Sequence, residues 1–81
     1  MPKLPAISGK QLILSLNKLG YQVVRQRGSH VRLEKATNAG VHKLTVPNHH
    51  SIARGTLHDI LTKVSLWNQV SKEELIENLK Q

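Results

Sequence analysis

A Gly-Ser pair at positions 28 and 29 separates two strand-like runs of the sequence, and this pattern predicts a β-hairpin with a two-residue turn. A turn of this length fixes how the flanking strands pair, because every residue along one strand then has a set partner on the other. The pairs that follow are Arg27 with His30, Arg25 with Arg32, and Val23 with Glu34.

Side chains alternate between the two faces of a strand, so this register predicts one apolar face and one cationic face. Val24, Val31 and Leu33 are expected to face a core. The opposite face is expected to carry the imidazole of His30 surrounded by three guanidinium groups, those of Arg25, Arg27 and Arg32. A face of this kind suits a phosphodiester, which is an anion.

The sequence has a start signal and a stop signal for a first helix. Ser8 to Gln11 has the form of a capping box, and Ile7 is placed to pack on Leu12 as a hydrophobic staple. Gly20 is placed to end the helix in the left-handed conformation. A helix is therefore expected between these two signals.

Three strands are expected next, at Tyr21–Arg27, His30–Lys35 and Val41–Val46. A second turn at 37–40 sets Leu33 opposite Leu44 and Glu34 opposite Lys43. In this register Lys43 and Thr45 join the face that carries His30.

Pro47 is expected to end the third strand, and two helices are expected after it. The first carries apolar residues at helical spacing, namely Leu57, Ile60, Leu61 and Val64. The second is short, begins after a cap at Ser71, and carries Leu75, Ile76 and Leu79. We expect a single α+β domain over residues 1–81 in the order α-β-β-β-α-α, with a core region at about 7–64 and a helical extension at 65–81.

Positive charge is concentrated in the first two thirds of the chain. Residues 1–54 hold nine lysines and arginines against one acidic residue, Glu34, a net charge of +8, whereas residues 55–81 have a net charge of −1. This pattern favours a nucleic-acid surface, although basic patches also bind acidic proteins. Tyr21 and Trp67 are the only aromatic residues, so contact with the phosphate backbone is expected rather than base stacking.

Several classes of protein are excluded by what the sequence lacks. Cysteine is absent, so neither disulfides nor a thiolate metal site are expected, and no apolar run reaches the roughly 18 residues that a membrane span needs. The start of the chain has no apolar segment of signal-peptide length, which predicts a cytoplasmic protein. No glycine-rich phosphate loop, Ser-His-Asp order or pair of carboxylates supports a nucleotide or serine hydrolase.

His30 is the candidate catalytic residue. Neighbouring guanidinium groups favour a neutral imidazole, which is able to take a proton from a ribose 2′-hydroxyl while the arginines stabilise charge on the phosphate. The alternative is that His30 is an ordinary solvated side chain beside a turn.

The other histidines give weaker signals. A metal site of His30, His49 and His50 is not expected, because adjacent residues point in different directions and no carboxylate or cysteine lies at ligand spacing. His49 is expected to make a polar contact near the following helix, or to be an exposed loop residue. Lys10, in the first turn of a helix, opposes the helix dipole and so hints at an anionic ligand. His42 and His58 carry no signal.

Five segments taken together resemble the HicA family of toxins. They are Ile-Ser-Gly-Lys at 7–10, Leu-Gly-Tyr at 19–21, Arg-Gln-Arg-Gly-Ser-His at 25–30, Thr-Val-Pro at 45–47 with His49, and Gly-Thr-Leu-His-Asp-Ile-Leu at 55–61. The resemblance implies a fold like that of double-stranded-RNA-binding domains, metal-independent cleavage of mRNA, and neutralisation by a HicB antitoxin encoded beside the toxin. By the same resemblance, His30 lies at the position of the family's catalytic histidine.

Three functional hypotheses remain open at this point. The first is an RNA endonuclease with His30 as general base, no cofactor, and RNA contacts from Lys10, Arg25, Arg27, Ser29, Arg32, Lys43 and His49. The second is a non-catalytic RNA-binding module that uses the same face. The third is a face that mainly binds an acidic protein, in which case little RNA affinity is expected.

Overall fold

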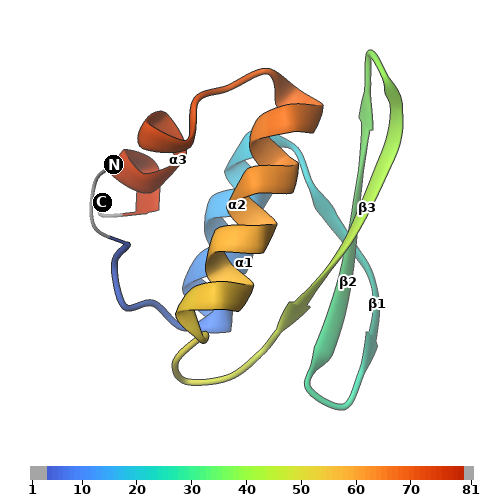
Figure 1. The fold of residues 1–81 in the computed structure, drawn as a ribbon. Helices are drawn as coiled ribbons and strands as arrows, with labels where there is room; N and C mark the ends of the chain where they lie inside the picture. The colour runs from blue at the N-terminus through green and yellow to red at the C-terminus, as the bar shows by residue number, and fades with distance from the viewer. Residues whose placement is uncertain (1–3, 80–81) are drawn as a thin grey trace.

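A computed structural model describes residues 4–79 and shows three helices and one antiparallel sheet in the order α-β-β-β-α-α (Figure 1). The helices and strands are α1 (Gly9–Leu19), β1 (Gln22–Arg27), β2 (His30–Thr37), β3 (Gly40–Pro47), α2 (Arg54–Asn68) and α3 (Lys72–Leu79). The predicted α+β fold is confirmed, and the strand ends differ from those expected by one or two residues. Residues 1–3 and 80–81, which include Lys3 and Lys80 of the charge count, lie outside the described residues.

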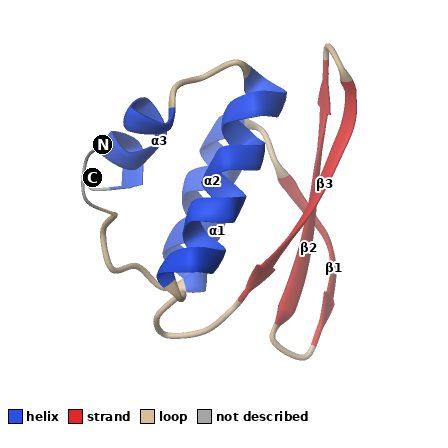
Figure 2. Cartoon of the chain, in the orientation of Figure 1, coloured by secondary structure: helices blue, strands red, loops and turns tan. Residues whose placement is uncertain are grey.

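The helices all lie on one side of the sheet. Helices α1 and α2 run side by side over one face, and α3 packs against both of them on the side away from the strands (Figure 2). We call the face toward the helices the inner face; its buried side chains are Val31, Leu33, Leu44 and Val46. Within residues 4–79, no helix covers the opposite, outer face.

The ends of α1 follow the predicted signals. The Gln11 backbone N–H donates to the Ser8 hydroxyl at 3.1 Å, and the Ser8 N–H donates to the Gln11 side-chain oxygen at 2.8 Å, which completes the capping box. Gly20 then ends the helix with φ of 112°, a conformation that other residues adopt at a cost. Ile7 and Leu12 are both buried in the core, as the staple predicted.

Helix α3 contributes to the same core as the rest of the chain. Its N-terminus is capped by Ser71, whose hydroxyl accepts from the Glu74 N–H at 3.1 Å. Leu75 and Ile76 are buried in one cluster with residues of α1, α2 and the inner face. Helix α3 therefore covers apolar side chains of α1 and α2 that would otherwise face water.

The hairpin of β1 and β2 has the predicted register only near its turn. Arg27 pairs with His30 and Arg25 with Arg32, but the register then shifts at a bulge between Val23 and Arg25. Val23 therefore lies opposite Leu33, and the predicted pairing of Val23 with Glu34 is wrong. A bulge of this kind places one extra residue in a strand and reverses the faces of the side chains beyond it.

The bulge also corrects the position predicted for Val24. This residue was expected to face the core, but half of its side chain is exposed, and it lines a hollow with outward-facing residues of β2 and β3. All six residues of β1 are exposed, because the helices pack mainly over β3 and not over this edge of the sheet. Strand β1 thus adds little to the core.

The hairpin of β2 and β3 has the predicted register throughout. Leu33 pairs with Leu44 and Glu34 with Lys43, and the second turn at 37–40 closes with Thr37 opposite Gly40. On β3, exposed residues alternate with buried residues from position 41 to 46. Lys43 and Thr45 therefore point to the outer face, as predicted.

Candidate functional site

A depression on the outer face lies over the end of the sheet that carries the first turn. Its lining residues come from all three strands and are Arg25, Arg27, His30, Arg32 and Thr45. The depression is open to solvent and has a volume of about 340 Å³. The predicted imidazole and its three predicted guanidinium neighbours thus lie together, and we refer to this set as the cationic depression.

The backbone register explains why these side chains meet. Arg27 is paired with His30 across the turn, and Arg25 is paired with Arg32 in the next position that shares their face. Thr45 is paired with Arg32 from the other side. Because β2 is the central strand, His30 and Arg32 are flanked on both sides, and five side chains that can form hydrogen bonds converge on one exposed surface.

Two other predicted residues lie near this depression without lining it. Lys43 lies on the same outer face, but it is paired with Glu34, the only acidic residue of positions 1–54. Ser29 is in the turn itself, and its backbone oxygen accepts a hydrogen bond from the Asn48 N–H at 2.6 Å. Ser29 therefore links the hairpin turn to the segment after β3.

The segment after β3 is held tightly between the hairpin and α1. The Gly9 N–H donates to the His49 carbonyl oxygen at 2.8 Å, and the Ile52 N–H donates to the Ile7 oxygen at 2.9 Å. A Cβ atom on Gly9 would lie 2.7 Å from the Asn48 Cα and closer still to the Pro47 carbonyl oxygen. Only a glycine allows α1 to begin this close to the segment at 47–49. Sequence reasoning assigned Gly9 to the capping box and missed this contact.

Lys10 and His49 lie in a separate, neighbouring depression. It is lined by Ser8, Lys10, Asn48, His49 and His50 at the N-terminus of α1. The hydrogen bond between Asn48 and Ser29 joins this region to the turn that precedes His30. The two depressions are therefore at the same end of the molecule, although no side chain lines both.

No metal centre is apparent in the part of the chain that the structure describes. No group of three or more His, Cys, Asp or Glu residues among positions 4–79 has an arrangement that fits a metal ion. The cationic depression itself has no carboxylate in its lining. Its chemistry is that of guanidinium groups, an imidazole and a hydroxyl, which together favour an anionic ligand.

His42, which carried no signal in the sequence, is a buried residue of the inner face. Its Nδ1 atom lies 2.6 Å from the Tyr21 hydroxyl, and its ring stacks on that of Trp67 with centroids 4.8 Å apart. The Asn68 side-chain amide donates to the Tyr21 oxygen at 2.8 Å, so Asn68, Tyr21 and His42 form one chain of hydrogen bonds. The strand alternation was the signal that could have found it, because position 42 shares a face with Leu44 and Val46.

Burial shifts the ionisation of both members of this pair. It lowers the pKa of His42 below its usual value of 6.5, with a further contribution from the positive charge of Lys63. Burial raises the pKa of Tyr21, although the hydrogen bond from Asn68 acts in the opposite direction. Both side chains are therefore neutral near pH 7, and with Trp67 and Asn68 they connect the residue before β1 to β3 and α2.

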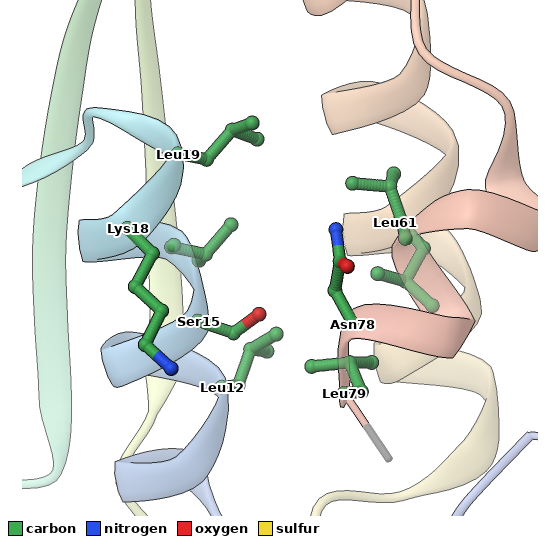
Figure 3. A pocket seen from close by; sticks show the side chains of 9 residues that line it. Leu12, Ser15, Lys18, Leu19, Leu61, Asn78 and Leu79 are labelled. Atoms are coloured by element: carbon green, nitrogen blue, oxygen red, sulfur yellow. The ribbon is translucent and has the colours of Figure 1, made fainter. Parts of the chain in front are cut away.

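A further hollow lies among the helices, far from the charged side chains of the sheet. Figure 3 shows Leu12, Leu19, Leu61 and Leu79 converging on it from α1, α2 and α3. Its volume is about 190 Å³, and its one charged lining residue is Lys18. Its lining is mainly leucine, with Ser15, Lys18 and Asn78 as the polar residues, and it has neither an arginine nor a histidine, so it lacks the groups that the cationic depression combines.

Comparisons with known proteins add one finding to this geometry. A family model described as the HicA toxin of bacterial toxin–antitoxin systems matches residues 9–66, which include the three strands, α1 and all but the last two residues of α2. Neither the proteins of curated function nor the solved structures contain a significant match. No helix among residues 4–79 has the length and apolarity required to cross a bilayer. The family match covers more than half of the chain, and the chain therefore belongs to the HicA family of toxins of bacterial toxin–antitoxin systems.

Proposed function

We propose that this toxin is a metal-independent endoribonuclease that cuts mRNA at the cationic depression, with His30 as the general base. The observation that carries the proposal is the convergence of His30 with Arg25, Arg27, Arg32 and Thr45 on one exposed surface. An imidazole among guanidinium groups joins a proton acceptor to anion-binding groups, the combination that cleavage of a phosphodiester needs.

The proposed reaction uses the ribose of the substrate as the nucleophile. The imidazole of His30 takes the proton of a 2′-hydroxyl, and the 2′-oxygen attacks the adjacent phosphorus. The bond between phosphorus and the 5′-oxygen breaks, and the departing oxygen takes a proton from water. The products are a 2′,3′-cyclic phosphate and a 5′-hydroxyl. The arginines stabilise the negative charge that builds on the phosphate oxygens during the attack.

The remaining predicted contacts bind the RNA on either side of the reacting phosphate. Lys43 extends the positive surface along the outer face. Lys10 and His49 lie beyond the turn in the neighbouring depression, and Ser29 lies between the two regions. We assign all four to RNA binding and none to the chemical step.

An acidic antitoxin that covers the cationic depression is the inhibitor we propose. The depression is open, and the charge of +8 on residues 1–54 attracts a negative partner. A protein in this position blocks His30 directly and need not change the fold of the toxin.

The test of the proposed function is cleavage of an mRNA by purified toxin in the presence of a chelator, with His30→Ala as the variant. Cleavage should continue in the chelator, should yield 2′,3′-cyclic phosphate ends, and should be lost in His30→Ala while RNA binding is kept. His58→Ala is the matched control and should cleave normally, because His58 is on α2, which covers the inner face of the sheet, and does not line the cationic depression. Unchanged RNA degradation by His30→Ala would assign the cleavage to a contaminant and leave the toxin as a non-catalytic RNA-binding module. Cleavage that needs added metal would refute the mechanism.

A further inference from the structure

The outer face of the sheet has a second hollow, which adjoins the cationic depression. It is lined at its outer side by Gln22, Val24, Glu34, Ala36 and Val41, and its volume is about 440 Å³. Val24 is 51% exposed and Val41 is 53% exposed, although both are large apolar residues in strands. We refer to this hollow as the valine hollow.

The bulge in β1 is the reason that this surface exists. Without the bulge, the alternation along β1 would place Val24 on the inner face beside Gln26. The shift in register between Val23 and Arg25 instead turns Val24 outward. Strand β2 also continues to Thr37 beyond its last pairing with β1, at Gln22 and Glu34, so the hollow opens where β1 begins.

The valine hollow has no arginine in its lining, and the one neutral side chain there that can donate a hydrogen bond is that of Gln22. The outward charged side chain in its lining is the carboxylate of Glu34, which repels phosphate. The one lysine of the lining, Lys35, donates its ammonium hydrogen to the side-chain oxygen of Asn68 on α2, so its charge is held toward the helices. A ligand that covers this hollow therefore brings apolar side chains and not a sugar–phosphate backbone.

Continuity with the cationic depression identifies the partner. Val24 directly precedes Arg25, and Ala36 lies on the same face of β2 as Arg32. One partner that spans both surfaces needs acidic groups over the arginines and an apolar side chain over the valines. RNA supplies the first of these features but not the second, whereas an acidic protein supplies both.

We propose that the valine hollow is a binding site for an apolar side chain of the antitoxin. The antitoxin and RNA compete for the same arginines, and contact at this hollow favours the antitoxin over RNA. The inference rests on the proposed function, in which an acidic antitoxin covers His30. RNA competes for every charge contact that the antitoxin makes, so charge contacts alone do not favour the antitoxin. Apolar contact at Val24 and Val41 adds affinity for the protein and none for RNA.

The decisive variant is Val24→Thr combined with Val41→Thr, because threonine keeps the branched shape that strands favour and adds a polar group. Val23→Thr is the matched control: Val23 is the preceding residue, is 46% exposed, and is paired with Leu33 on the other face. The probe is the purified antitoxin that is encoded beside the toxin gene, and binding is measured by calorimetry at low and high salt. RNA cleavage and thermal unfolding are measured in parallel.

We expect the double variant to weaken antitoxin binding about tenfold or more at both salt concentrations, since apolar contact is not screened by salt. RNA cleavage and the melting temperature should change little, and the Val23→Thr control should behave like the unmodified toxin. By contrast, Arg27→Ala should weaken antitoxin binding most at low salt. The same binding measurements made in a His30→Ala background keep this test independent of whether His30 is catalytic.

Four results would overturn the inference. The first is antitoxin binding that is unchanged in the double variant, and the second is an equal loss of RNA binding, which would make the hollow part of the RNA site. The third is self-association of the toxin alone through these valines, detected by sedimentation and abolished by Val41→Glu. The fourth is an unmodified toxin that does not bind the antitoxin at all.

Discussion

Replacing Gly9 by alanine tests whether the start of α1 fixes the segment that holds the hairpin turn. The new Cβ would lie under 3.0 Å from backbone atoms of Pro47 and Asn48, and backbone, unlike the end of a long side chain, cannot rotate away. Overpacking of this kind costs about 1–3 kcal/mol. The gain in helix propensity from Gly to Ala is about 0.5–1 kcal/mol, so we expect a net loss of about 1–2 kcal/mol.

Gly55 provides a matched control on α2. It is also in the first turn of a helix, and a Cβ atom there would meet nothing within 4 Å. Gly55→Ala should therefore show the propensity gain alone, about 0.5–1 kcal/mol of added stability. The two variants should differ by about 1.5–3 kcal/mol, which corresponds to roughly 6–24 °C in melting temperature for a domain of this size.

The assay is thermal and urea unfolding followed by circular dichroism, with RNA cleavage measured at a temperature where both variants are folded. Gly9→Ala should cleave more slowly than Gly55→Ala, because a displaced Asn48 no longer positions Ser29 and the turn before His30. Equal stability of the two variants would refute the reasoning, since it would mean that the segment at 47–49 moves freely.

Three further predictions address the charges and the buried pair. Binding of single-stranded RNA should weaken with salt, with a log–log slope near −3 for about four or five phosphates, and Arg27→Ala should flatten the slope by about 0.7; a slope near zero would contradict the electrostatic interpretation. The contribution of His42 to stability should be fully present well above pH 6.5 and should be lost as the pH falls below 6.5, because the lowered pKa of His42 lets the unfolded chain bind a proton first; a gain in stability of the unmodified protein relative to a His42→Gln variant on acidification, measured by chemical denaturation, would contradict it. Tyr21→Phe should cost about 1–3 kcal/mol, since it removes the partner of His42 Nδ1; an unchanged melting temperature would be the opposite result.

Local signals predicted the parts of the fold that are locally determined. The capping box at Ser8, the left-handed Gly20 and the apolar spacing of α2 each involve residues within one or two helical turns. The turn at Gly28 likewise fixed the pairs nearest to it, and these are the pairs that bring His30 among the arginines. The histidine and the three arginines of the cationic depression were predictable because they lie within three residues of this turn, and the position of Thr45 followed from the second turn.

The parts that sequence reasoning missed depend on contacts between distant segments. The bulge at Val24 has no glycine or other local marker in the sequence. It shifts the pairing of β1 with β2 by one residue, so that Val23 lies opposite Leu33 and Gln22 opposite Glu34. The close approach of Gly9 to the segment at 47–49 joins residues nearly 40 positions apart. His42 was missed for a different reason, since its inward position followed from the β2–β3 register but a single histidine has no pattern of its own.

The position of His30 depends on more than the core beneath the sheet. Strand β1 is exposed along its whole length, so burial of apolar side chains anchors the hairpin through Val31 and Leu33 of β2 and does little to hold β1 and the turn. The turn of that hairpin is held instead by the hydrogen bond from Asn48 to Ser29, and Asn48 is held by its fit against Gly9. Because β1 is exposed, its arginines are accessible to an anionic partner. Solvent also screens the repulsion between the guanidinium groups, so their proximity costs little stability. It follows that substitutions of the arginines should alter binding with little effect on stability, whereas a substitution at Gly9 should alter both.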